Sequence, residues 1–326
     1  MKLSVLDQSV VSKGETAHHA FQKTAKLARV TEKLGYTRFW VAEHHNTNGL
    51  AGTSPEILIS HLAAQTNHIR IGSGGVLLPQ YSPYKIAENF KVLEALYPNR
   101  IDLGIGRSPG GSPATRLALT DGIRKSLNDF PRQVKDLQEF TLDKPNQQGV
   151  IAYPKNVTIP ELWHLGISQK GARVAAEKGT AFTYGHFITP VNGEQTINHY
   201  LRFFRSSPFL QQPKINVCIF VVCAPSQERA EEIALSQDLW LLAVENNGDT
   251  RIVSIEEAKS RMVTNEEKVK MKENRKRMII GTPDFVKEEI LKLSERYQTD
   301  EFMILTNVYD FQDKVQSYSL LAEKFL

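Results

Sequence analysis

Residues Phe39–Asn46 (FWVAEHHN) join an apolar run to a carboxylate, two imidazoles and an amide. This abrupt change is typical of a buried strand that ends at the rim of a core. Along an extended chain, successive side chains point to opposite faces, so His44 faces one way while Glu43 and His45 face the other. We therefore expect the two adjacent histidines to diverge, with His44 directed toward a site. A surface turn with incidental histidines is the alternative interpretation.

Similar apolar runs recur along the chain and alternate with segments of helical periodicity. The expected strands cover residues 2–7, 38–42, 69–78, 100–104, 161–166, 181–188, 214–223 and 301–307. The expected helices cover residues 16–34, 56–66, 83–96, 129–140, 172–178, 194–204, 226–244 and 314–325. Eight strands that alternate with eight helices predict an α/β fold, a parallel sheet closed into a (β/α)8 TIM barrel. A doubly wound open sheet is the runner-up, because counting elements does not prove closure.

Two stretches interrupt the strand–helix repeat, as insertions after the fourth and seventh strands. Residues 142–160 form a proline-containing loop, and residues 250–278 are rich in charge. The charged stretch is typical of a solvated helix or a mobile loop, and the alternative is a lid over the barrel mouth. Neither stretch marks a clean boundary, so we expect one domain over residues 1–326.

The composition indicates a globular protein without affinity for membranes or nucleic acid. The 40 basic and 36 acidic residues nearly balance at a net charge of +4, and no basic stripe accompanies them. No run of 18 apolar residues is present, and a strand-like run from Lys2 leaves no room for a signal peptide. Cys218 and Cys223 have an odd spacing on one expected strand, so they face apart and remain unpaired. Two buried thiols favour a cytoplasmic location.

The active site of a barrel of this kind lies at the carboxyl ends of the strands. The fifth expected strand ends in Gly166–Gly171 (GISQKG), just before a helix. There, the helix N-terminus, the Ser168 hydroxyl and the Gly171 N–H could bind a phosphate. Arg107, after the fourth strand, could add a positive charge to the same anion. An ordinary capped loop and a structural ion pair of the arginine are the competing interpretations.

Two glycines, Gly74 and Gly75, follow the third expected strand. Without side chains, they would let a flat ring lie against the backbone, although a bulge or tight turn explains them equally well. A metal site is not expected, because Glu43, His44 and His45 diverge and do not form a His-Glu-x-x-His motif.

The chain resembles the bacterial luciferase-like flavin monooxygenases, in their non-luminescent oxidoreductase branch. The resemblance is carried by residues 40–46 (WVAEHHN), 72–79 (GSGGVLLP), 104–107 (GIGR), 165–168 (LGIS) and 280–283 (IGTP). It implies a TIM barrel that binds FMN, usually as FMNH2 from a separate flavin reductase. It also implies a homodimer.

By the same resemblance, His44 lies near the reactive edge of the flavin, and Gly74–Gly75 is a cis peptide beneath its ring. The positions of Arg107, Ser168 and Gly171 contact the phosphate region. Gly106 replaces a cysteine that luciferases carry, which argues against light emission. A second phosphate-binding arginine is not matched, since Arg124, Lys125 and Arg132 are expected to be surface charges.

Three hypotheses follow for the function. The first is an FMN-dependent monooxygenase that uses reduced flavin and O2 on a small aldehyde, ketone or hydrocarbon. In it, His44 hydrogen-bonds or moves a proton, and Glu43 orients the local network. The second is hydride transfer with the deazaflavin F420. The third is a flavin carrier without turnover.

Overall fold

The eight barrel strands form one closed parallel ring in the computed structural model, which describes residues 1–108, 110–155, 157–246 and 248–326. The ring consists of β1 (Lys2–Asp7), β2 (Arg38–Val41), β3 (Arg70–Ser73), β4 (Ile101–Gly106), β5 (Glu161–Gly166), β6 (Ala181–Gly185), β7 (Ile215–Cys223) and β9 (Glu301–Leu305). Each strand pairs in parallel with the next, and β9 pairs with both β7 and β1, which closes the ring. The predicted TIM barrel is confirmed.

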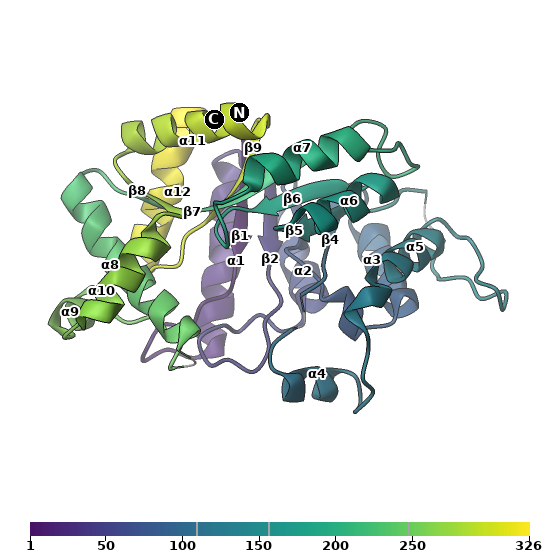
Figure 1. Cartoon of the computed structure of the whole chain (residues 1–326), viewed down its shortest axis with the longest axis horizontal. Coiled ribbons are helices and arrows are strands. Elements are labelled where there is room, and N and C mark those ends of the chain that lie inside the picture. Colours follow the sequence, from purple (N-terminus) through teal and green to yellow (C-terminus); the bar gives the residue numbers. More distant parts are fainter. Residues whose placement is uncertain (109, 156, 247) are drawn as a thin grey trace.

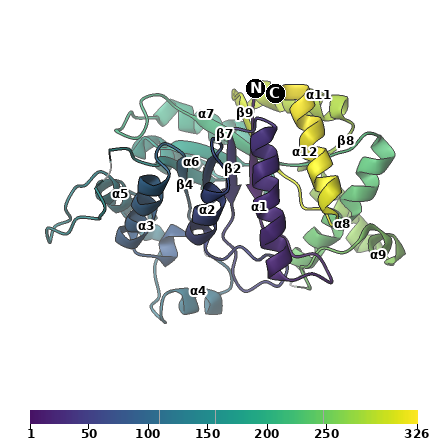
Figure 2. The same cartoon turned by 180° about the vertical axis from the view of Figure 1, so that it is seen from behind.

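Helices surround the ring, and the two chain termini lie together at one end of the molecule (Figure 1). The helices between successive strands are α1 (Ala17–Lys33), α2 (Pro55–Ala64), α3 (Pro83–Leu96), α5 (Phe130–Thr141), α6 (Gln169–Lys178), α7 (Gly193–Phe203) and α8 (Gln227–Glu245). The last helix, α12 (Phe311–Phe325), lies beside α1 (Figure 2). Across the described residues, no helix is both long and apolar enough to cross a bilayer.

Several elements were not predicted from the sequence, in and beside the second insertion and elsewhere in the chain, whereas the described residues of 142–160 form a loop as expected. After β4 come α4 (Pro113–Leu119) and η2 (Leu127–Asp129), and η1 (Leu78–Gln80) precedes α3. After α8 come α9 (Ile255–Ser260), α10 (Asn265–Arg275), β8 (Met278–Gly281) and α11 (Pro283–Tyr297). Strand β8 pairs with the far half of β7 and stands outside the closed ring. It has only four residues and follows a charged segment, so the sequence shows no periodicity that would predict this strand.

The third strand is shorter than predicted. It ends at Ser73, and the chain then turns at Gly74–Gly75 so that Val76 pairs with Ile105. The following residues, Val76–Leu78, are buried, and this burial explains why they read as a continuing strand. The expected sixth strand likewise ends early, at Gly185.

The barrel interior is apolar in the middle and charged at the amino ends of its strands. Trp40 packs edge-on against Trp163 at 5.3 Å between ring centroids, with Leu6, Cys218 and Met303 in the same cluster. Cys218 thus faces the interior, whereas Cys223 belongs to the outer layer beneath the helices. Both thiols are free and buried, as their spacing predicted.

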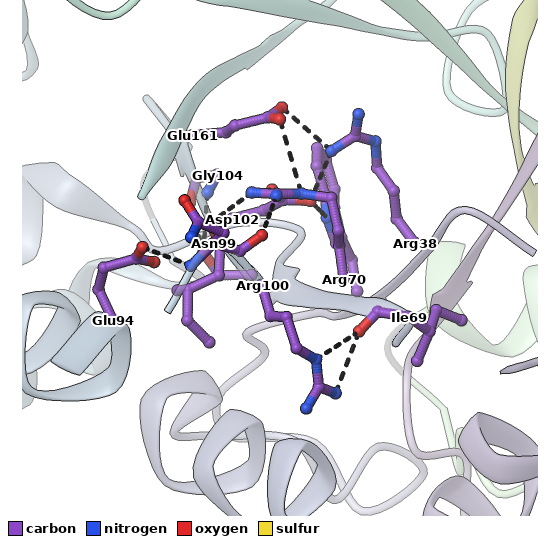
Figure 3. A network of polar contacts seen from close by, with 12 residues as sticks. Arg38, Ile69, Arg70, Glu94, Asn99, Arg100, Asp102, Gly104 and Glu161 are labelled. Atoms are coloured by element: carbon purple, nitrogen blue, oxygen red, sulfur yellow. Dashed lines mark hydrogen bonds and ion pairs between the residues drawn. The ribbon is translucent and has the colours of Figure 1, made fainter. Parts of the chain in front are cut away.

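Below the tryptophans, a buried ion network closes the amino end of the barrel (Figure 3). The Arg38 guanidinium donates to Glu301 Oε1 at 2.5 Å and to Asp102 Oδ2 at 2.8 Å. Arg70 reaches the other oxygen of Asp102, and Glu161 lies 3.2 Å from Arg38. These residues come from five different strand starts, so the network ties the strands together at the end opposite to the predicted site.

Candidate functional site

The predicted site residues lie at the carboxyl ends of four consecutive strands. In the sheet register, Val41 is opposite Ser73, and Gly106 is opposite Leu165. The segments that follow these residues therefore leave the barrel at one rim. His44 stands at the β2 side of this rim, Gly74–Gly75 at β3, Arg107 at β4 and Ser168 after β5.

His44 points away from His45, as the alternation predicted. Its main-chain N–H donates to Gly52 O at 2.8 Å, and its imidazole Nε2 lies 3.0 Å from Gln8 Nε2. Burial lowers the pKa of His44 to about 4, and the neighbouring His45 acts in the same direction. At neutral pH the imidazole is therefore uncharged.

Glu43 points to the opposite side and collects three donors. It accepts from the Leu77 N–H at 2.8 Å and the Tyr81 hydroxyl at 2.5 Å, and it lies 2.7 Å from His45 Nε2. Burial raises the pKa of Glu43 despite these contacts. Among the described residues, no hydrogen bond joins Glu43 to His44. The carboxylate thus holds the segment between β3 and α3 against the end of β2.

The Gly74–Gly75 peptide bond is cis, in agreement with the resemblance. A Cβ at Gly74 would lie 2.5 Å from Leu6 Cδ1, and one at Gly75 would lie 2.8 Å from Gly104 O. Close packing beneath the turn therefore requires both glycines. By contrast, a Cβ at Gly106 would meet nothing nearer than Ser108 N at 4.0 Å, so the rim is open there.

Arg107 is exposed, and it makes no hydrogen bond or ion pair with any other described residue. The structural ion pair considered for it is therefore not formed within the described part of the chain. Its charge acts on His164, a buried side chain of β5. Burial lowers the pKa of His164 to about 3, and Arg107 contributes in the same direction. Within the described part of the chain, Arg107 is thus an unpaired cation at the rim.

Ser168 is the N-cap of α6, and its Oγ accepts from the Gly171 N–H at 3.3 Å. The Gly171 N–H, expected to face a phosphate, is therefore already engaged within the cap. The Ser168 hydroxyl hydrogen is still able to donate. The segment forms an ordinary capped helix start, which retains the partial positive charge of a helix N-terminus.

The three basic residues considered for a second phosphate contact have different surroundings. Arg132 pairs with Asp136 on the surface of α5, at 2.6 Å. Lys125 donates to Gln80 O at 2.9 Å. Arg124 is exposed and lines a surface hollow together with Lys125. The expectation of a surface charge thus holds for Arg132 and Arg124, whereas Lys125 is partly buried.

The charged stretch of residues 250–278 is mostly packed against α8. Arg275 of α10 binds the buried carboxylate of Asp238. The start of the stretch reaches the rim, where Thr250 Oγ1 accepts from the Gly49 N–H at 3.0 Å and Ile252 pairs with Ser12. Near its end, Arg277 donates to Phe187 O at 3.3 Å, just after β6. The stretch therefore braces the loop that follows His44.

Sequence reasoning missed two site residues, Gln8 and Asn307. Both are polar, both follow a buried apolar strand, and both are almost fully enclosed. Gln8 directly follows the first expected strand, so attention to polar residues at strand ends would have found it. Asn307 was included in the last expected strand, which ends two residues earlier, at Leu305. Among the described residues, no group of three His, Cys, Asp or Glu side chains could hold a metal ion.

A parallel barrel with reactive side chains at the carboxyl rim defines an enzyme scaffold. A sequence model of the luciferase-like monooxygenases matches residues 1–299, and the chain belongs to this family of flavin-dependent monooxygenases. The protein YceB of Bacillus subtilis (strain 168) is 54% identical over 328 residues, which cover 99% of both chains. The N-acetyl-S-alkylcysteine monooxygenase of the same strain is 36% identical and covers 100% of this chain and 98% of its own.

Solved structures agree with this assignment. Apo-MsnO8 superposes with a TM-score of 0.91 at 34% identity, covering 99% of this chain and 98% of that one. Two more distant structures share the fold. One is the oxygenating constituent of 3,6-diketocamphane monooxygenase from Pseudomonas putida in complex with FMN, with a TM-score of 0.72 at 19% identity over 100% of this chain and 97% of that one. The other is an F420-dependent secondary alcohol dehydrogenase, with a TM-score of 0.66 at 15% identity over 98% and 97%.

Proposed function

We propose that the protein is the oxygenase component of an FMN-dependent monooxygenase, which receives reduced flavin from a separate reductase. The observation that carries the proposal is Arg107, an exposed cation without a partner among the described residues, beside the start of α6. An unpaired arginine next to a helix N-terminus suits a phosphate monoester. The FMN-bound oxygenating constituent among the fold relatives supports both parts of the proposal.

The residues of the rim fit the two ends of FMN. Arg107 and the Ser168 hydroxyl would hold the phosphate, with the start of α6 at Gly171 adding its partial charge. The open backbone at Gly106 and the Gly74–Gly75 turn would adjoin the ring. Bound reduced flavin would supply the electrons that activate O2.

The protein side chains then serve position and protonation. His44, uncharged at neutral pH, would hydrogen-bond to the reacting oxygen or substrate. Glu43 would act indirectly, because its contacts with Leu77 and Tyr81 set the position of the turn under the ring. The brace between Thr250 and the loop after β2 would help to exclude water.

We place the substrate among small organic molecules. The relative named N-acetyl-S-alkylcysteine monooxygenase makes small thioethers the first compounds to test, beside aldehydes, ketones and hydrocarbons. A homodimer and a cytoplasmic location, both expected above, belong to this proposal. Light scattering on the eluting protein would measure the oligomeric state.

Titration of the protein with FMN and, separately, with F420 tests the cofactor. We expect FMN to bind, and we expect O2 uptake when reduced FMN and a substrate panel are added. Arg107→Ala should weaken FMN binding by about 10- to 100-fold, the value of a charge-assisted hydrogen bond, and leave riboflavin affinity unchanged. Preferential binding of F420 would contradict the proposal and favour the hydride-transfer alternative.

His44→Ala separates an enzyme from a flavin carrier. If the protein is a monooxygenase, this change should lower turnover by about 100-fold or more and alter FMN affinity little. A carrier would show tight FMN binding and no substrate-dependent O2 uptake in either form.

A further inference from the structure

A line of side-chain amides runs from His44 into the protein. Gln8 follows directly after β1, and its Nε2 lies 3.0 Å from His44 Nε2. Asn307 lies two residues beyond β9, and its Nδ2 donates to Gln8 Oε1 at 2.6 Å. Gln8 is 5% exposed and Asn307 is fully enclosed, so water competes little for these hydrogen bonds.

At the inner end of the line the main chain of Asn307 is anchored, while the side-chain Oδ1 of Asn307 has no hydrogen-bond partner among the described residues. The main-chain N–H of Asn307 donates to Gln237 Oε1 at 3.0 Å. Because a main-chain N–H can only donate, the Gln237 amide has one orientation, and its Nε2 then faces Met278 Sδ at 3.3 Å. The buried helix α8 thus fixes the backbone at Asn307.

With the two amides oriented as in the structure, the order of donors and acceptors places the proton of His44. Gln8 accepts from Asn307 through Oε1, so the nitrogen that it turns toward His44 is a donor. His44 Nε2 must therefore accept, and in a neutral imidazole the proton then lies on Nδ1. We infer that Gln8 and Asn307 are positioning residues that hold His44 as the Nδ1–H tautomer. The catalytic value of this tautomer rests on the role proposed for His44 above.

The hydrogen bonds from Asn307 through Gln8 to His44, here called the relay, also oppose protonation of His44 to the imidazolium form. A proton on Nε2 would bring two N–H donors face to face, unless both amides turned over. The hydrogen bond from the His44 main-chain N–H to Gly52 O restrains this residue, so its side chain cannot easily move away from Gln8. Nδ1 has no hydrogen-bond partner among the described residues, so it is the nitrogen that can donate to a bound molecule.

Nitrogen NMR of the 15N-histidine-labelled, cofactor-free full chain tests the relay directly. The His44 signals are assigned by their loss in His44→Gln. We expect a protonated Nδ1 and an unprotonated Nε2 at neutral pH. Gln8→Met keeps the size of the side chain and removes the amide, so the preference for this tautomer should disappear. Flavin-dependent O2 uptake should fall about tenfold, which is the effect expected from the loss of one hydrogen bond. The FMN Kd should change less than about twofold.

Gln133→Met is the matched control. Gln133 is also 5% exposed, and its amide donates to Leu78 O at 3.4 Å from helix α5. This variant should leave the His44 signals in place. Asn307→Leu removes the donor at the far end of the relay and should reproduce the effect of Gln8→Met, which covers the case in which Gln8→Met does not fold.

A wild-type His44 with its proton on Nε2 would overturn the inference. So would an unchanged tautomer in a folded Gln8→Met or Asn307→Leu protein. Because the tautomer is measured without cofactor, the proposed function is tested separately. A relay seen by NMR in a protein that neither binds FMN nor consumes O2 would support the positioning role and refute the oxygenase.

Discussion

At the scale of single residues, the side chains that follow β2 point to two opposite faces and make different contacts. His44 meets the buried amide of Gln8, whereas Glu43 and His45 meet Tyr81 and the turn after β3. Simple alternation along an extended chain accounts for this split. In the proposed site, Glu43 would therefore act on the shape of the site, and His44 would face its chemistry.

Glu43→Gln should destabilise the protein, because an amide cannot accept from Leu77, His45 and Tyr81 together. We expect the free energy of unfolding to fall by about 1–3 kcal/mol, as measured by urea denaturation. The exposed Glu288, paired with Lys292 on α11, provides the control Glu288→Gln, which should change stability by less than about 0.5 kcal/mol. An equal loss of unfolding free energy in the two variants would contradict the bracing role of Glu43.

Glu161 makes the stability dependent on pH. Burial opposes its ionisation, but the charges of Arg38 and Arg70 outweigh burial and lower its pKa from 4.5 to about 2. A carboxyl whose pKa is lower in the folded state stabilises the fold above the unfolded pKa, and this contribution is lost as the pH falls. The stability difference between wild type and Glu161→Gln should therefore be constant above about pH 5 and should shrink from pH 4.5 toward pH 2.

Urea denaturation between about pH 7 and pH 3 measures this difference. Glu177→Gln serves as the control, since Glu177 pairs with Arg173 on the exposed face of α6. A gap between wild type and Glu161→Gln that stays constant across this whole range would refute the predicted contribution.

At the scale of elements, the N-cap residue of helix α6 has a structural role and, in the proposed site, a binding role. Ser168 caps the helix through Gly171, as Ser226 caps α8 through Arg229 at 3.2 Å. Each Ser→Ala change should cost about 1 kcal/mol of stability. Only Ser168→Ala should also weaken FMN binding, by about 3- to 10-fold, because the helix α8 cap has no part in the proposed site.

Flavin fluorescence titration and urea denaturation of both cap variants check this prediction. Equal FMN affinity of Ser168→Ala and Ser226→Ala would assign Ser168 to capping alone and would move the phosphate site elsewhere on the rim.

The elements themselves were largely predictable, and the exceptions share a cause. The helix over residues 83–96 matches its prediction, since its apolar face repeats at helical spacing and a proline marks its start. Strand β8 and helices α9 and α10 were missed, because they are short or highly charged and pack against α8. Helix α11, which packs against α12 and α7, was missed as well. Their identity depends on what they contact and not on local periodicity.

At the scale of the whole molecule, the barrel separates stability from function at its two ends. The amino end holds the buried network, in which Arg38 binds Asp102 and Glu301. Figure 3 shows Arg38 and Asp102 of this network, and the predicted site lies at the opposite, carboxyl end. The side chain of Arg38 is 3% exposed, so removing it leaves the buried Glu301 without an ion-pair partner among the described residues and leaves Asp102 with Arg70.

Arg38→Met should lower the free energy of unfolding by about 3–5 kcal/mol. The exposed pair of Arg173 with Glu177 on α6 offers the control Arg173→Met, with an expected loss below about 1 kcal/mol. The FMN Kd of folded Arg38→Met should match that of the wild type. A stability loss as small as the control's would show that the network contributes little.

The sequence by itself determined which side chains stand at strand ends and which way they alternate, because burial of one face imposes a local period on an extended chain. That period, together with the positions of the glycines and the helix cap, is enough to single out His44, Gly74–Gly75, Arg107 and Ser168. Only the tertiary structure decided their partners. Gln8 and Asn307 are 299 residues apart, and they meet because β9 closes the ring against β1. Register and closure are properties of the assembled sheet, so no local pattern encodes them.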